Sequence, residues 1–162
     1  MIPLNNNIQK TFSPPIEEAF NWLENINTPK KLKLLNLSQA APISSPPKEI
    51  CQAIANASLN NKESHLYGPI LGNNNLRKEI SKRWKKIYCA EINTSNVGIT
   101  SGSNQAFCAA LTSIASPGDN IIITNPWYFN HKMWLDMSSI KSKIIPLNNK
   151  MLPEPKIAKK LI

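Results

Sequence analysis

The chain has 162 residues, of which 41% are hydrophobic and 18% charged, a composition that suits one globular domain and excludes disordered and fibrous proteins. No apolar run approaches the roughly 18 residues of a bilayer span, and the asparagine-rich start lacks the features of a secretory signal, so we expect a cytoplasmic protein with no membrane helix. The net charge of +9 leaves an anionic partner such as nucleic acid as an alternative.

The first third of the chain carries two helix signals and one weak strand signal. Residues 1–13 are expected to form a loose arm, followed by a short helix over residues 15–25. Residues 34–37 suggest a short strand, and a second helix is expected to begin near Pro47. Each helix should bury one face, made of Ile16, Ala19, Phe20 and Leu23 in the first and of Ile50, Ala53, Ile54 and Ala57 in the second.

From residue 73 onward, segments with helical spacing alternate with short apolar runs. Such alternation predicts an α/β fold with a mostly parallel sheet that is covered by helices. We predict helices over 73–88, 104–115 and 129–138, strands over 97–100, 120–124 and 143–147, and the first turns of another helix over 155–162.

The densest positive charge lies on the helix predicted over residues 73–88. Its apolar residues recur at helical spacing, which indicates one buried face and one solvated face. We interpret the basic cluster as that solvated face, because no nucleic-acid reader motif is visible, but a basic nucleic-acid binder stays an alternative. The cluster consists of Arg77, Lys78, Lys82, Arg83, Lys85 and Lys86.

The cysteines and histidines predict neither disulfides nor a metal site. Cys51, Cys89 and Cys108 are widely spaced and odd in number, so we interpret them as buried, reduced thiols. His65 and His131 have no partners at metal-ligand spacing and are expected to have structural or surface roles.

Ser101-Gly102-Ser103 joins the predicted strand 97–100 directly to the helix that follows. The start of a helix offers unpaired backbone N–H groups and the positive end of the helix dipole, and the two hydroxyls add donors, so a phosphate suits this turn. Gly102 would let the backbone approach the anion closely. The alternative is an ordinary strand-to-helix turn with a serine N-cap.

Two other segments are candidates for ligand contacts. Tyr67 opens a turn-rich loop, residues 67–72, that leads into a helix; a structural tyrosine is the alternative. After the turn at residues 117–119 and the next strand, Pro126-Trp127-Tyr128 places aromatic rings where α/β sheets bind ligands. Hydrophobic packing at the rim of the sheet is the alternative there.

In this order and spacing, the three segments resemble the N-terminal part of the fold type I, pyridoxal 5'-phosphate-dependent aminotransferases of class I/II. The resemblance begins near residue 35, where residues 36–39 and Pro42 look like the family's entry segment. It implies an α/β, three-layer αβα fold that is incomplete in this chain. Residues 1–45 would be an N-terminal arm and the start of the small domain, and residues 46–162 the first half of the cofactor-binding large domain.

The resemblance also implies an activity and a set of binding residues. A complete relative transfers an amino group from an amino acid to a 2-oxo acid and works as a homodimer. Ser101, Gly102 and Ser103 match the loop that binds the cofactor phosphate. Tyr128 matches the aromatic residue that stacks on the cofactor ring, with Trp127 as the alternative if the register slips. Tyr67 matches the tyrosine that reaches the other subunit's phosphate, and Ala40 stands where many members have a glycine near the substrate carboxylate.

The residues that carry the family's chemistry are expected to lie beyond the matched positions. They are a lysine that bonds to the cofactor, an aspartate at the ring nitrogen, an asparagine and a tyrosine at the ring oxygen, and a late arginine for the substrate carboxylate. Lys141 and Lys143 follow serines but come too early to be that lysine. We therefore expect the chain to hold no catalytic residue and to be inactive alone. A non-enzymatic anion-binding α/β module is the other alternative.

Overall fold

The computed structural model describes residues 2–24, 26, 32, 34–35, 37–38 and 41–162. The chain divides into two compact units: the first joins Met1–Ser38 to Ser101–Ile162, and the second is Gln39–Thr100. A division into compact units does not test where the domains of a family fold begin and end. The predicted domain boundary near residue 45 therefore stays a prediction. No helix in the described part of the chain combines the length and the apolar character that crossing a membrane requires.

The first unit is built on a parallel pair of strands. Strand β1 (Asn120–Asn125) pairs with β2 (Lys141–Pro146) from Asn120 opposite Lys141 to Asn125 opposite Pro146. Helix α6 (Phe129–Met137) connects them, and α5 (Ser103–Ile114) precedes β1. The α/β class and the parallel sheet predicted from the alternating segments are confirmed; β2 begins two residues earlier than expected.

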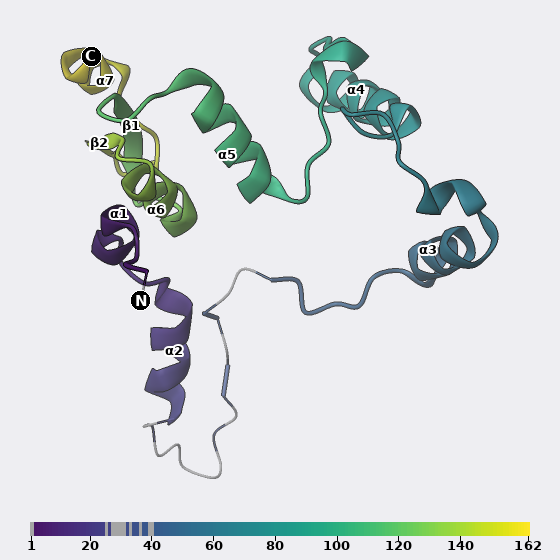
Figure 1. The fold of residues 1–162 in the computed structure, drawn as a ribbon, viewed down its shortest axis with the longest axis horizontal. Coiled ribbons are helices and arrows are strands. Elements are labelled where there is room, and N and C mark those ends of the chain that lie inside the picture. Colours follow the sequence, from purple (N-terminus) through teal and green to yellow (C-terminus); the bar gives the residue numbers. More distant parts are fainter. Residues whose placement is uncertain (1, 25, 27–31, 33, 36, 39–40) are drawn as a thin grey trace. The chain divides into compact units, whose positions relative to one another are not determined.

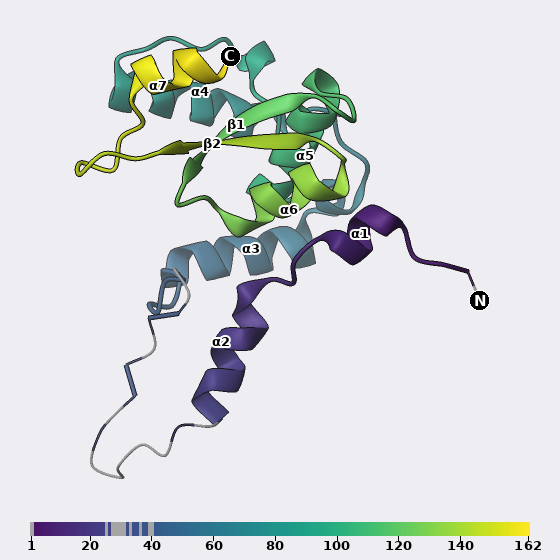
Figure 2. The ribbon, with the colours of Figure 1, turned by 90° about the vertical axis from the view of Figure 1, so that its left-hand side faces the viewer.

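Helices lie on both faces of this sheet, as the ribbon shows from two directions (Figures 1 and 2). Leu111 of α5, Leu135 of α6 and Ile140 form the core, and Ile121 and Ile123 of β1 pack against it. Alternation along the strand turns Ile122 to the opposite face, where α7 (Pro155–Leu161) lies against β2. This layering is the partial three-layer arrangement that the resemblance implies.

The N-terminal arm contains a short helix, α1 (Asn6–Lys10), so the expectation of a loose arm was wrong. The Asn5 side chain accepts a hydrogen bond from the Asn7 backbone N–H and caps the helix. The Asn7 side chain donates to the Ser139 hydroxyl at 2.6 Å, which holds α1 beside α6. Sequence periodicity missed α1 because its stability comes from polar caps and contacts rather than from an apolar stripe. Helix α2 (Pro15–Glu24) confirms the next prediction.

The second unit consists of helices and loops. Helix α3 (Lys48–Asn60) leads into the short 3-10 helix η1 (Lys62–His65), and α4 (Asn74–Tyr88) into η2 (Thr94–Asn96). Asn73 caps α4 by accepting from the backbone N–H groups of Asn75 and Leu76. Arg77 ties α4 to the loop after it: its Nε donates to the Val97 carbonyl at 2.7 Å and its Nη2 to the Thr94 carbonyl at 2.8 Å.

The predicted strand over residues 97–100 is absent from the described structure. The segment is extended, but its one ladder-like bond runs from the Ile99 N–H to the Leu71 carbonyl at 3.0 Å. A strand requires a neighbour to pair with along its length, and the second unit provides none. Leu34, Leu35 and Leu37 are likewise irregular, and Asn36, in the middle of the other predicted strand, lies outside the described residues.

Several predictions of burial were wrong. Ile16 and Phe20 of α2 and Ile50 and Ile54 of α3 are exposed, although both helices form where predicted. The three cysteines are free thiols as expected, but Cys51 and Cys89 are exposed and Cys108 is only half-buried. Helical spacing shows which residues share a face; burial also needs an element that packs against that face.

Candidate functional site

The turn at residues 101–103 opens α5 through a glycine rather than a serine. Gly102 is the N-cap, with φ 86° and ψ 166°, and makes no side-chain cap. The serine N-cap considered as the ordinary alternative is therefore wrong, because Ser103 is already the first helical residue. A Cβ at Gly102 would meet no atom within 4 Å, so the positive φ calls for glycine and the space beside it is open.

The first turn of α5 presents backbone donors toward that space. In the described structure the N–H groups of Ser103, Asn104 and Gln105 make no hydrogen bond, as expected of the first residues of a helix. Ser101, Gly102 and Ser103 are all exposed. These donors, the two serine hydroxyls and the helix dipole together favour an anion at this position.

Tyr128 lies at the end of a cluster of rings that reaches back to α5. Tyr128 meets the ring of His131 edge-on, with centroids 5.1 Å apart, and His131 stacks on Phe107 at 3.9 Å with 13° between the planes. Phe107 stands on α5 one turn after Ser103. This ring cluster (Phe107, His131 and Tyr128) therefore links Tyr128 to the N-terminal half of α5.

The Tyr128 ring is held and still accessible. Its hydroxyl accepts a hydrogen bond from the Asn130 side chain at 2.8 Å, and its ring also tilts against Phe129. The side chain is 47% exposed. Trp127, the alternative for the stacking position, takes part in no ring pair in the described structure.

His131 is a residue of the site that the sequence did not single out. Partial burial lowers its pKa below the usual value, so the imidazole is neutral at neutral pH. A neutral ring packs between two aromatic rings without a cost in charge desolvation. The expectation of a structural or surface role stays a prediction for His131, whose ring packs against Phe107 and Tyr128. The only sequence signal for its position was its place three residues after Tyr128 on a helix.

The first unit does not contain the other two predicted residues. Tyr67 belongs to the second unit, where it is fully exposed and lines a cavity of about 380 Å³ with Asn61, Glu63 and Asn73. Ala40 lies outside the described residues. Of the predicted site, Tyr128 and residues 101–103 share the first unit, in which the ring cluster connects Tyr128 to α5.

Lys141 and Lys143 both lie in β2; Lys143 was expected in this strand, and Lys141 joins it because β2 begins earlier than predicted. Lys143 donates to the Leu161 carbonyl at 2.5 Å and so caps the end of α7. Their partners in register, Asn120 and Ile122, belong to the first half of β1, whereas Tyr128 follows its last residue. Five strand residues span roughly 17 Å, so Lys141 stands at the wrong end of the sheet to reach a group covered by Tyr128.

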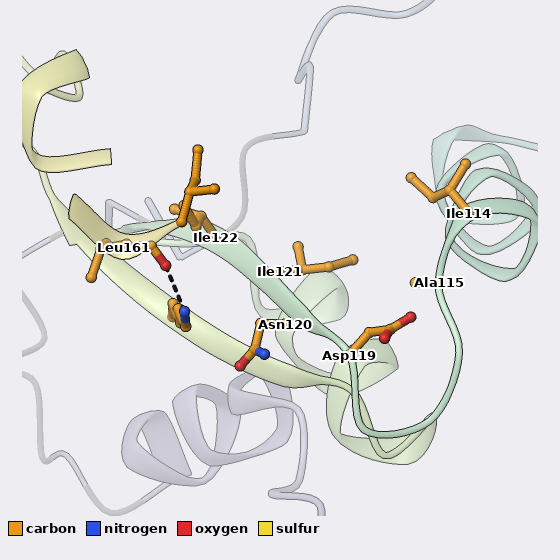
Figure 3. A pocket seen from close by; sticks show the side chains of 9 residues that line it. Ile114, Ala115, Asp119, Asn120, Ile121, Ile122 and Leu161 are labelled. Carbon is orange, nitrogen blue, oxygen red and sulfur yellow. Dashed lines mark hydrogen bonds between the residues drawn. The ribbon is translucent and has the colours of Figure 1, made fainter. Parts of the chain in front are cut away.

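A cavity of about 430 Å³ lies at that other end of β1 (Figure 3). Its lining is mixed: Ile114, Ile121 and Leu161 are apolar, whereas Asp119 and Asn120 are polar. The hydrogen bond from Lys143 to Leu161 crosses one side. None of its lining residues belongs to the predicted site. Nor do the described residues contain a cluster of histidine, cysteine, aspartate or glutamate side chains able to hold a metal ion.

Comparison with known proteins decides the family. The model of the family described as aminotransferase class I and II matches residues 33–154. The chain belongs to this family. The N-terminal portion recognised from the sequence motifs is thereby confirmed.

The curated relatives are longer than this chain. It is 31% identical to an aspartate aminotransferase of Pyrococcus horikoshii and to the transaminase BacF of Bacillus subtilis, in each case over 75% of this chain and 31% of the relative. The substrate-bound structure of BacF superposes with a TM-score of 0.81 at 25% identity, covering 96% of this chain and 40% of BacF. The alanine aminotransferase of Pyrococcus furiosus, at 22% identity and a TM-score of 0.81, supports the fold alone.

Proposed function

We propose that the protein is, in complete form, a pyridoxal phosphate-dependent aminotransferase that moves an amino group from an amino acid to a 2-oxo acid. The observation that carries the proposal is the ring cluster, which links an accessible Tyr128 to the open, donor-rich start of α5. Family membership supplies the reaction class. A phosphate and an aromatic ring on one small ligand match these two features.

The residues present fit the cofactor at two points. The open N-cap at Gly102 and the free N–H groups of the next turn would hold the phosphate, helped by the hydroxyls of Ser101 and Ser103. Tyr128 would cover one face of the ring. When bound, pyridoxal phosphate supplies the carbonyl carbon that takes up the amino group and a ring that withdraws electrons from it.

The chain's own part in catalysis is then to anchor and orient. The α5 dipole and amides bind a dianion without requiring a lysine or arginine at the turn, and the ring cluster keeps Tyr128 in place. Neutral His131 places no positive charge behind the stacking ring. We assign no catalytic residue to these 162 residues: the bonding lysine and its partners belong to the part of the family fold that this chain does not cover. The chain alone is inactive in this proposal.

The proposal extends to assembly and location. In a homodimer, Tyr67 would reach the phosphate held by the other subunit, which suits its full exposure. Ala40 would lie near the substrate carboxylate, where the alanine methyl group narrows the space that a glycine leaves. The protein would act in the cytoplasm on soluble amino acids and 2-oxo acids.

The test uses the protein as its gene encodes it and measures its affinity for two compounds. One is pyridoxal phosphate and the other is pyridoxal, which lacks the phosphate. The proposal expects much tighter binding of pyridoxal phosphate, competition by inorganic phosphate, and weaker binding of both compounds by Tyr128→Leu. Equal affinity for the two compounds would refute it. A plain anion-binding module would instead be unaffected by Tyr128→Leu, and a nucleic-acid binder would shift DNA with affinity that falls steeply as salt rises.

A further inference from the structure

The Gln105 side chain accepts a hydrogen bond from the Ser101 backbone N–H at 2.5 Å. We propose that Gln105 is a positioning residue that sets the shape of the phosphate turn without touching the cofactor. The inference rests on the proposed function and deepens it, because it names what holds the anion-binding turn in its binding conformation.

The position of Gln105 explains why it can do this. With Gly102 as N-cap, Gln105 is the third helical residue of α5, the position from which a glutamine reaches back over the start of a helix. Here it reaches one residue beyond the N-cap and closes residues 101–105 into a loop. Gly102 has no side chain to cap the helix, so Gln105 supplies the side-chain contact across this turn.

Closing the loop restrains a turn that contains a glycine with a positive φ. Gly102 has a φ of 86°, and glycine moves among many backbone conformations at little cost. With Ser101 tied to Gln105, the turn is held with the N–H groups of Ser103, Asn104 and Gln105 unpaired and available. A turn fixed before the anion arrives loses less entropy on binding it.

The effect of Gln105 should stay within the turn. Its side chain is exposed, whereas α5 is anchored in the core by Leu111 and by Phe107, on the next two turns. Removing the Gln105 amide therefore leaves the packing of the helix intact. The Ser101 N–H would then be unpaired and the loop open.

The experiment compares Gln105→Ala and Gln105→Met, the second of which keeps the length of the side chain without its acceptor. Dissociation constants for pyridoxal phosphate and pyridoxal are measured on the protein as its gene encodes it, with amide hydrogen exchange at residues 101–105. Gln52→Ala, an exposed glutamine of α3, is the matched control. Both Gln105 variants should bind pyridoxal phosphate about three- to tenfold more weakly, the worth of one ordinary hydrogen bond. Pyridoxal binding and the control should not change, and exchange at Ser101 should accelerate.

Each possible outcome either supports or overturns the inference. Unchanged pyridoxal phosphate affinity in both variants overturns the inference and leaves the proposed function standing. An equal loss for pyridoxal and pyridoxal phosphate also overturns it, because Gln105 would then act on the fold rather than on the phosphate turn. Wild-type protein that does not prefer pyridoxal phosphate over pyridoxal refutes the proposed function and, with it, the inference.

Discussion

The two units of the chain have equally regular helices and very different cores. In the first unit Leu111, Leu135, Ile140 and Ile145 are buried, with Leu135 at 0% exposure; among the described residues of the second unit, Val97 is the one buried hydrophobic residue. Helix α4 is nevertheless well capped, although its Trp84 is 42% exposed. The comparison teaches that caps and spacing make a helix, whereas a core requires elements that meet from distant parts of the chain.

The largest expected effect concerns the covalent bond between a lysine and pyridoxal phosphate. In the proposed function the first unit supplies an anchor and a cover, whereas the bonding lysine belongs to the part of the family fold that this chain does not cover, so the isolated chain should form no selective bond with pyridoxal phosphate. Borohydride reduction with substoichiometric pyridoxal phosphate, followed by peptide mapping, should label lysines of both units in a scattered way. Stoichiometric labelling of one residue such as Lys141, together with amino-group transfer, would contradict this prediction and the proposed inactivity.

The next effect concerns cooperativity. Because the second unit leaves apolar faces such as Ile50 and Ile54 exposed, the chain expressed alone should be aggregation-prone, with a second unit that is partly molten. Hydrogen exchange should be faster across α3 and α4 than across β1 and β2. A sharp, cooperative thermal transition of a monomer would count against this prediction.

Matched substitutions in the two units sharpen the comparison. Leu135→Ala removes a fully buried side chain and should lower the free energy of unfolding of the first unit by about 2–5 kcal/mol. Ile54→Ala removes a side chain of the second unit that is 65% exposed. It should change the free energy of unfolding of that unit by no more than about 0.5 kcal/mol. Denaturant unfolding of both variants checks this, and similar losses would show that α3 has a partner which the structure does not reveal.

Within the first unit, a substitution in the turn at residues 101–103 should change cofactor binding without changing the stability of the core. Ser103→Ala should weaken pyridoxal phosphate binding by about 1.5–3 kcal/mol, the worth of a charge-assisted hydrogen bond, and leave unfolding unchanged. Ser113→Ala, on the last turn of the same helix, is the control for hydroxyl loss on α5. Equal cofactor retention by Ser103→Ala and wild type would remove Ser103 from the site.

The smallest effect is a dependence on pH. Burial lowers the pKa of His131 in the folded chain, so the unfolded chain binds the proton first as the pH falls. The stability that comes from neutral His131 is therefore complete above its unfolded pKa and declines as the pH falls through it toward the lower folded pKa. Urea midpoints between pH 8 and 5 should fall more for wild type than for His131→Phe, which keeps a stacking ring without the titration. Parallel curves would refute the assignment.

Much of the fold was predictable because its signals are local. Proline and polar caps set the starts of α2, α3 and α4 close to the predicted residues. The apolar run at residues 121–123 marked β1, and the glycine between two serines marked the turn that opens α5. The short helix α1 was missed, since its Asn5 cap and its hydrogen bond to Ser139 leave no periodic apolar trace.

The sequence by itself determined most of the helices, the glycine turn that opens α5 and the family, because each depends on neighbouring residues or on motifs in order. Tertiary structure decided which faces are buried, the pairing of β1 with β2, and the packing of His131 against Phe107 and Tyr128. It also left residues 97–100 without a ladder. The physical reason is that a helix satisfies its own backbone hydrogen bonds, whereas a strand, a core and a ring cluster are completed only by residues far away in the chain.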